Sequence, residues 1–144
     1  MGQAVCRSLI GTPFRLHLID ERKEWVGSDE IPQGVIRHAC EWDDFVEEAE
    51  WEDENTYVVV MTHRHDVDQK IIECVVDKPT RYVGLIGSDS KWQRFQQRFE
   101  IHGLDLKKFE KVRCPIGLKI GGKAPQEVAI SLAAELLSVH YGQV

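Results

Sequence analysis

The predicted fold rests on residues 57–68, which read Tyr-Val-Val-Val-Met-Thr-His-Arg-His-Asp-Val-Asp. The first four residues are β-branched or aromatic, and no polar residue interrupts them before residue 62. A short apolar run of this kind predicts a strand that is buried on both faces, as in a parallel sheet. The predicted strand ends at residue 62, where a group of ionisable side chains begins.

A helix is predicted directly after this strand. Residues 66–76 combine charged side chains with the apolar positions Ile71, Ile72, Val75 and Val76, which suits an amphipathic helix. A buried strand, a polar turn and a helix make half of a βαβ unit. Open parallel sheets bind ligands outside the carboxyl ends of their strands, so His63 and His65 are predicted to lie at the ligand-binding edge.

Strands and helices are predicted to alternate along the rest of the chain. The predicted strands cover residues 14–19, 34–39, 57–62 and 82–86, and residues 112–117 are either a short edge strand or an extended loop. The predicted helices cover residues 2–10, 42–51, 66–76, 89–99 and 124–141. This alternation indicates an α/β fold, Rossmann-like, with a mainly parallel sheet flanked by helices. We expect a single domain over residues 1–144. A Rossmann-like domain normally begins with a strand, whereas this chain begins with a predicted helix, so the first strand is missing.

Composition and charge exclude several classes of protein. With 24 acidic and 18 basic residues the net charge is −6, which argues against a nucleic-acid binder. No apolar stretch approaches the roughly 20 residues that span a bilayer, so no membrane association is expected. No signal peptide is recognised, and the four cysteines are widely spaced without a Cys-x-x-Cys pair. We therefore expect a cytoplasmic protein.

Three motifs resemble a known family in order and spacing. They cover residues 58–68, residues 82–88, and residues 114–121 together with 125–131. These segments resemble the C-terminal Rossmann domain of the XdhC/CoxI family, the xanthine dehydrogenase accessory proteins. The resemblance spans nearly the whole chain.

The resemblance implies an accessory role more than a catalytic one. Such a domain is implied to bind the molybdenum cofactor (molybdopterin) and to assist its sulfuration with a cysteine desulfurase. It is also implied to deliver the cofactor to an apo-enzyme of the xanthine dehydrogenase type. Two other functions stay open: an NAD(P)-dependent oxidoreductase or nucleotide-binding Rossmann domain, and a non-binding oligomerisation module. Fold alone does not separate these three.

The start of the chain departs from the family pattern. In the family the domain begins with a first strand and a glycine-rich loop ending Gly-His-Val-Gly, and Gly2 matches the last glycine of that loop. The missing strand belongs between the strands at residues 14–19 and 57–62 in a doubly wound order. Its loss leaves exposed strand edges, so we expect either pairing of those two strands or a homodimer.

Asp20 is a candidate nucleotide-binding residue. It ends a predicted strand eighteen positions after Gly2, and an acid about 20 residues past the glycine loop typically binds a ribose 2′-hydroxyl. The alternative is a surface acid or a helix cap.

His63 and His65 are candidate pocket residues. In an extended segment, residues two apart point to the same side, so both imidazoles are expected to face a ligand. Imidazoles near neutral pH can bind the phosphate of a pterin cofactor. The alternatives are a metal site completed by Asp66 or Asp68, which we consider less favoured, and a hydrogen-bonded pair that orders the loop.

Gly84, Gly87 and Ser88 flank the end of the next predicted strand. Glycine permits close approach of a ligand to the backbone, and the amides at a helix start can bind an anion. Lys91 and Arg94 on the first turns of that helix are placed to assist. Turn chemistry alone also explains Gly87.

Cys114 and Gly121 complete the candidate site. Cys114 is the one cysteine predicted in a loop beside the pocket, where a thiolate can ligate molybdenum or carry sulfur. A buried, inert thiol is the alternative. Gly121 precedes the last predicted helix, whose start is a second possible anion-binding position.

Overall fold

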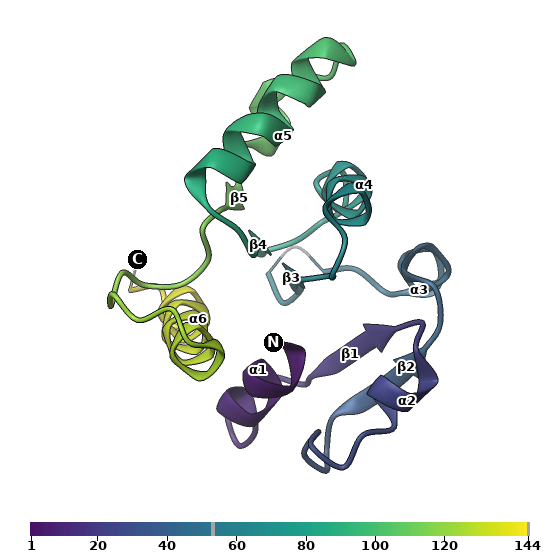
Figure 1. Ribbon diagram of the computed structural model, residues 1–144, viewed down its shortest axis with the longest axis vertical. Helices are drawn as coiled ribbons and strands as arrows, with labels where there is room; N and C mark the ends of the chain where they lie inside the picture. Colours follow the sequence, from purple (N-terminus) through teal and green to yellow (C-terminus); the bar gives the residue numbers. More distant parts are fainter. Residues whose placement is uncertain (53, 144) are drawn as a thin grey trace. The chain divides into compact units, whose positions relative to one another are not determined.

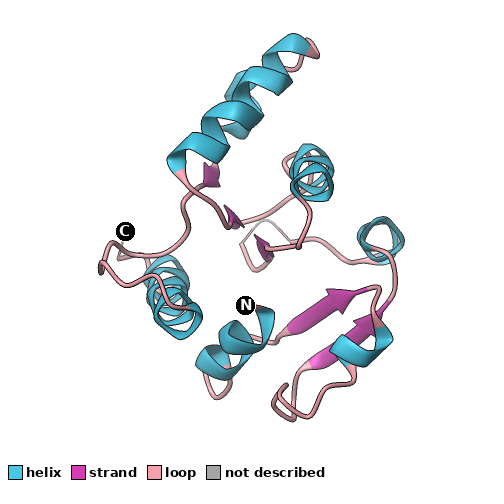
Figure 2. Cartoon of the chain, in the orientation of Figure 1, coloured by secondary structure: helices cyan, strands magenta, loops and turns pink. Residues whose placement is uncertain are grey.

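The computed structural model of the protein describes residues 1–52 and 54–143, and it confirms the alternation of strands and helices (Figures 1 and 2). The chain forms two compact units. Unit 1 comprises residues 1–49 and 117–144, and unit 2 comprises residues 50–116. Among the described residues, no helix is long and apolar enough to cross a membrane.

Unit 1 contains two strands and four helices among its described residues. In chain order they are α1 (Gly2–Leu9), β1 (His17–Asp20), α2 (Lys23–Val26), β2 (Ile36–Ala39), α3 (Trp42–Glu48) and α6 (Pro125–His140). β1 and β2 pair in parallel, with His17 opposite Ile36 and Asp20 opposite Ala39.

Two apolar contacts organise unit 1. α1 packs against α6, although more than 100 residues separate them in the chain (Figure 1). The other face of α1 contributes Cys6 to a cluster with Ile31 and Val35, against which Leu16 and Leu18 pack. Because Leu16 and Leu18 alternate in an extended segment, both reach this cluster from the same side.

Unit 2 holds the segment that decided the predicted fold. Its elements are β3 (Tyr57–Val60), α4 (His65–Val75), β4 (Tyr82–Leu85), α5 (Asp89–Ile101), the 3₁₀ helix η1 (Leu106–Phe109) and β5 (Val112–Arg113). The three strands form a parallel sheet in the order β3-β4-β5. β4 is central and all four of its residues are buried.

Aromatic side chains of α5 form the core beside this sheet. Phe95 and Phe99 are buried, and the Phe99 ring stacks on Phe109 of η1 with 4.0 Å between ring centroids. Trp92 meets Phe99 edge-to-face at 6.1 Å. The spacing of three and four residues along α5 therefore places the aromatic rings on one face.

Some local predictions were wrong. β3 is not buried on both faces: Val60 is buried, whereas Tyr57 to Val59 are only partly buried, because β3 lies at the edge of its sheet. Residues 23–26 form the short helix α2, which was not among the predicted helices. α3 ends at Glu48, three residues before the predicted end of that helix at residue 51.

The described strands form two separate sheets. β1 ends one sheet and β3 ends the other, and the two strands do not pair with each other. Of the two outcomes expected for these edges, pairing of the strands at residues 14–19 and 57–62 is not found among the described strands. The homodimer stays a prediction.

Candidate functional site: a pocket at the carboxyl ends of β3 and β4

A pocket of about 320 Å³ opens at the carboxyl ends of β3 and β4 in unit 2. We call it the anion pocket. Its lining comes from the segments after the two strands and from the first turns of α4 and α5, and comprises Thr62, His63, His65, Ile86, Gly87, Ser88, Lys91 and Arg94. The pocket therefore brings together four of the predicted site residues: His63, His65, Gly87 and Ser88.

A buried ion pair joins the elements that form the pocket. The Lys91 ammonium donates to Asp68 Oδ2 at 2.9 Å and to the Ile86 carbonyl at 2.7 Å. The other oxygen of Asp68 accepts from the Thr62 amide at 2.9 Å. These bonds connect α4 and α5 to the ends of β3 and β4. Because each charge is neutralised and hydrogen-bonded, the pair is tolerated in a buried position.

Gly87 gives the Lys91 side chain its path to Asp68. Gly87 has a φ of +149°, a backbone conformation that residues with a side chain rarely adopt. A Cβ at this position would also collide with Cδ of Lys91. A glycine is therefore required here for the ion pair as much as for the turn.

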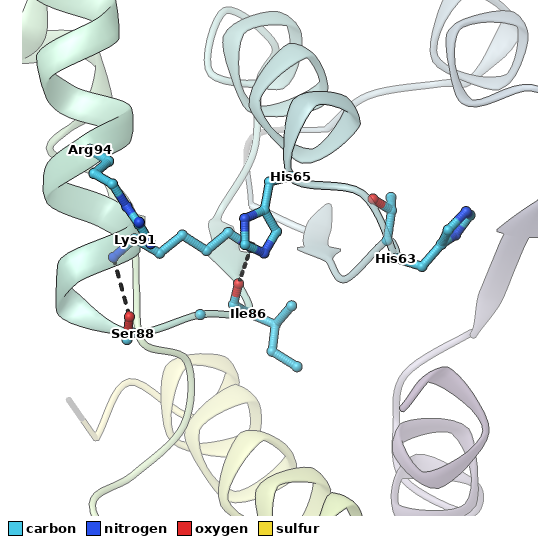
Figure 3. A pocket seen from close by; sticks show the side chains of 8 residues that line it. His63, His65, Ile86, Ser88, Lys91 and Arg94 are labelled. Atoms are coloured by element: carbon cyan, nitrogen blue, oxygen red, sulfur yellow. Dashed lines mark hydrogen bonds between the residues drawn. The ribbon is translucent and has the colours of Figure 1, made fainter.

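The two histidines diverge, contrary to the prediction that they point to the same side. His65 is the first residue of α4, so the segment from His63 to His65 is not a continuous strand. In Figure 3 the His65 ring lies toward Lys91, whereas the His63 ring points away from Lys91 and Arg94. His65 is therefore the histidine better placed to contact a ligand in the pocket.

The two carboxylates considered as metal ligands are both engaged by cations. Asp68 binds Lys91, and Asp66 accepts from the Arg64 guanidinium at 2.7 Å and 3.2 Å. The hydrogen bond from Arg64 holds the pKa of Asp66 below its usual range. Among the described residues, no group of three or more His, Cys, Asp or Glu side chains is arranged to hold a metal ion.

The start of α5 presents positive groups to the pocket. Ser88 is the N-cap, and its hydroxyl accepts from the Lys91 amide at 3.2 Å. The helix has 13 residues, so the dipole at its first turn favours an anion. Arg94 extends an exposed guanidinium from the second turn, and this group suits bidentate contact with a phosphate.

Cys114 follows β5 and lies beside the pocket. Its thiol is directed at the carbonyls of Gly87 and Ser88, with sulfur–oxygen distances of 3.7 Å and 3.8 Å. Burial raises the pKa of Cys114 to about 11, and nearby Lys91 offsets this only in part. Thiol donation to carbonyl oxygens requires the protonated form, so this arrangement favours the thiol over the thiolate.

Gly84 does not line the anion pocket. A Cβ on this central residue of β4 would stand 2.7 Å from Cε1 of Tyr82 and 2.8 Å from Cγ2 of Ile116. Both neighbours are side chains of unit 2, so the space beside Gly84 is filled by packing. The glycine thus has a packing role in this structure.

The three other candidate residues lie in unit 1. Gly2 begins α1 and Gly121 lies in the segment before α6, with open space around it. Asp20 ends β1, as predicted for a ribose-binding acid. Both of its carboxylate oxygens already accept from the Arg22 side chain, at 3.0 Å and 2.8 Å. A ribose hydroxyl at Asp20 would therefore share these oxygens with Arg22.

Comparison with known proteins decides the family. The model of the XdhC Rossmann domain family matches residues 1–136. The chain belongs to this family. The match confirms the resemblance found in the sequence motifs, and it includes the whole anion pocket of this XdhC Rossmann domain.

Relatives of the XdhC Rossmann domain are longer proteins. The Escherichia coli protein YqeB, described as uncharacterized, is 26% identical over 140 residues, which are 96% of this chain and 25% of YqeB. A Bacillus subtilis protein described as a probable xanthine dehydrogenase subunit is 34% identical over 79 residues, 55% of this chain and 22% of that protein. A crystal structure titled as a xanthine dehydrogenase from Bacillus halodurans superposes with a TM-score of 0.81 at 22% identity. The superposition covers 99% of this chain and 40% of the Bacillus halodurans chain, and the two share the same fold.

The buried ion pair between Asp68 and Lys91 was not predicted from the sequence. Asp68 shares the apolar stripe of α4 with Ile71, Ile72 and Val75, and Lys91 shares that of α5 with Phe95. An acid and a base at positions where each helix faces the core are a signal for a buried ion pair. This pattern was available in the sequence, but Asp68 was considered only as a possible metal ligand.

Proposed function

We propose that this XdhC Rossmann domain binds the molybdenum cofactor through the cofactor's phosphate. The observation that carries the proposal is the group of donors at the carboxyl ends of β3 and β4: the exposed Arg94, the His65 imidazole and the first turn of α5. A phosphate is the anion for which helix starts and guanidinium groups are best suited.

The size of the pocket supports binding of one end of the cofactor. Sites that enclose a whole small molecule have volumes of roughly 300–1,000 Å³, and the anion pocket at about 320 Å³ is at the lower limit. A phosphate and the adjoining atoms fit this space, and the larger pterin would extend out of it. The cofactor supplies oxo and sulfido chemistry when bound, and the residues of this pocket bind and orient it.

Cys114 does not fit the role of a molybdenum ligand in this arrangement. A thiolate is the species that ligates metals and carries sulfur, and burial raises the pKa of Cys114 to about 11. We therefore assign the sulfur transfer to a cysteine desulfurase partner. The domain's own contribution is to hold the cofactor while the partner acts.

The proposed client is an apo-enzyme of the xanthine dehydrogenase type. This part of the proposal is supported by the name of the Bacillus subtilis relative, which describes it as part of a probable xanthine dehydrogenase. The chain spans about a quarter of the length of the curated relatives it matches, so the partners of the whole proteins are proposed here and not observed. We further propose that the domain forms a homodimer through the unpaired edges of its sheets.

The test is a binding titration with molybdopterin, NADPH and AMP under anaerobic conditions. We expect saturable binding of molybdopterin that inorganic phosphate competes away. Arg94→Gln should weaken this binding on the order of tenfold, since it removes a charge-assisted contact. Arg98→Gln is the matched control, because Arg98 lies on the same helix and donates to Gln69 instead. Binding of NADPH without binding of molybdopterin would contradict the proposal and favour the oxidoreductase.

A further inference from the structure

A second cavity, of about 240 Å³, lies in unit 1. It is lined by Gln3 from the first turn of α1, Glu24 and Trp25 from α2, and Ser28 from the loop that follows. α2 begins three residues after β1 ends, so these groups gather at the carboxyl end of β1. That is the position at which open parallel sheets bind ligands. The cavity shares no residue with the anion pocket.

Trp25 gives this cavity a rigid aromatic wall. The side chain is half exposed, at 50%, and the Arg22 guanidinium lies 4.2 Å from the ring centroid. Arg22 is itself fixed by two hydrogen bonds to Asp20. The ring is therefore held in place before any ligand arrives, which reduces the entropic cost of binding. A cation–π contact alone explains the position of the ring but not the polar cavity beside it.

The polar groups of the cavity mainly accept hydrogen bonds. Ser28 Oγ already accepts from Gln3 Nε2 at 3.4 Å and from the Glu30 amide at 3.1 Å, so its hydroxyl hydrogen points elsewhere. Gln3 offers its Oε1, and Glu24 offers two carboxylate oxygens. A ligand that matches this set is a flat ring that donates from amino groups and ring N–H groups.

The surrounding charge excludes a phosphate from this cavity. Residues 20–30 contain five carboxylates against two basic side chains, and one of the basic groups, Arg22, is paired with Asp20. An anion would be repelled by Glu24 and its neighbours. The cavity volume is also below the roughly 300–1,000 Å³ of sites for whole small molecules, so it suits a single ring system.

We propose that this cavity, the Trp25 site, binds the 2-amino-4-oxo-pyrimidine edge that guanine and pterins share. The ring stacks on Trp25, and its adjacent N–H and NH₂ groups donate to the two oxygens of Glu24. Base–aromatic stacking and a paired carboxylate act together in this arrangement. The Trp25 site lies outside the anion pocket, so the inference does not depend on the proposed function.

The experiment is isothermal titration calorimetry with guanosine, inosine, adenosine and 6-hydroxymethylpterin. Inosine is guanosine without the 2-amino group, and we expect it to bind on the order of tenfold more weakly. Preference for the pterin over guanosine identifies a pterin cofactor as the source of the ring, and the reverse preference identifies a nucleotide. Equal binding of inosine and guanosine, or tighter binding of adenosine, overturns the proposal, as does the absence of saturation.

Variants separate this site from the anion pocket. Trp25→Ala and Glu24→Gln should each weaken guanosine or pterin binding on the order of tenfold, whereas Trp25→Phe keeps most of it. Glu21→Gln is the control, since it removes a neighbouring charge that does not line the cavity. Circular dichroism confirms that each variant is folded. Guanosine and pterin binding that is unchanged by Trp25→Ala and Glu24→Gln overturns this inference, and it leaves the proposed function, which Arg94→Gln tests, intact.

Discussion

An Asp–cation pair lies beside the carboxyl ends of parallel strands in each unit, and the two pairs differ in burial. Asp20 and Arg22 in unit 1 approach to 2.8 Å, with 27% and 31% of their side chains exposed. Asp68 and Lys91 in unit 2 approach to 2.9 Å, with 0% and 7% exposed. The distances are alike, so burial and hydrogen-bond partners set what each pair does.

The buried Asp68–Lys91 pair holds together the strand ends that form the anion pocket, whereas the exposed Asp20–Arg22 pair positions one surface side chain. Solvent and salt screen the Asp20–Arg22 attraction, so it contributes little to stability while it holds Arg22 over Trp25. Asp68 and Lys91 also bind the Thr62 amide and the Ile86 carbonyl, so their loss would release both strand ends. The comparison leads to four predictions, in decreasing order of expected effect.

Lys91→Met should have the largest effect. It leaves the Asp68 carboxylate buried without its cation, which costs about 3–5 kcal/mol in the free energy of unfolding. Urea denaturation measures this loss. The double variant Lys91→Met/Asp68→Leu removes both charges and should recover a large part of it. Equal stability of the single variant and the wild type would show that the pair is not buried in solution.

Cys114 should react slowly with iodoacetamide. A pKa raised from 9.0 to about 11 lowers the thiolate fraction at pH 8 about hundredfold. The pKa is raised because burial favours the neutral thiol over the thiolate. The rate of alkylation should therefore keep rising with pH up to about pH 11. Mass spectrometry of the peptide that contains Cys114 gives the rate at each pH. Alkylation as fast as that of a free thiol would instead support a direct sulfur role for Cys114.

Gly87→Ala should lower the free energy of unfolding by about 1–3 kcal/mol, because it adds backbone strain and displaces the Lys91 side chain. Gly103→Ala is the matched control in the same unit, since Gly103 has a φ of +73° and open space around it. Thermal denaturation should show a larger loss for Gly87→Ala. An equal loss would mean that only the backbone angle matters.

Arg22→Leu should change stability by less than about 1 kcal/mol, since its partner is partly exposed. Denaturation at low and high salt measures both the size of the effect and its screening. A loss as large as that of Lys91→Met would remove the distinction between the two pairs.

The periodicity of the sequence predicted most of the fold. The aromatic spacing of α5, the unbroken apolar runs of β3 and β4, and Ser88 as a cap are all local signals, and each matches the structure. The partial exposure of β3 was not predictable in this way. It depends on whether a neighbouring strand pairs with that edge, which is a property of the sheet and not of the strand.

The candidate site was predicted in part. The rule that ligands bind at carboxyl ends of parallel strands led to His65, Gly87 and Ser88. The direction of the His63 side chain and the pKa of Cys114 depend on where α4 begins and on how deeply the segment after β5 is buried. The spacing of residues in the motif predicts neither the start of α4 nor the burial of the segment after β5. Asp20 was placed correctly at the end of β1, but its pairing with Arg22 required coordinates.

The central claim is that the carboxyl ends of β3 and β4 form a phosphate-binding pocket, and an NMR titration with inorganic phosphate tests it most directly. Backbone amide shifts should change saturably at His65, Ser88 and the first turn of α5, and Arg94→Gln should weaken the response on the order of tenfold. Residues 1–49 should not respond. Shifts that are spread over the surface, or that are unaffected by Arg94→Gln, would contradict the account.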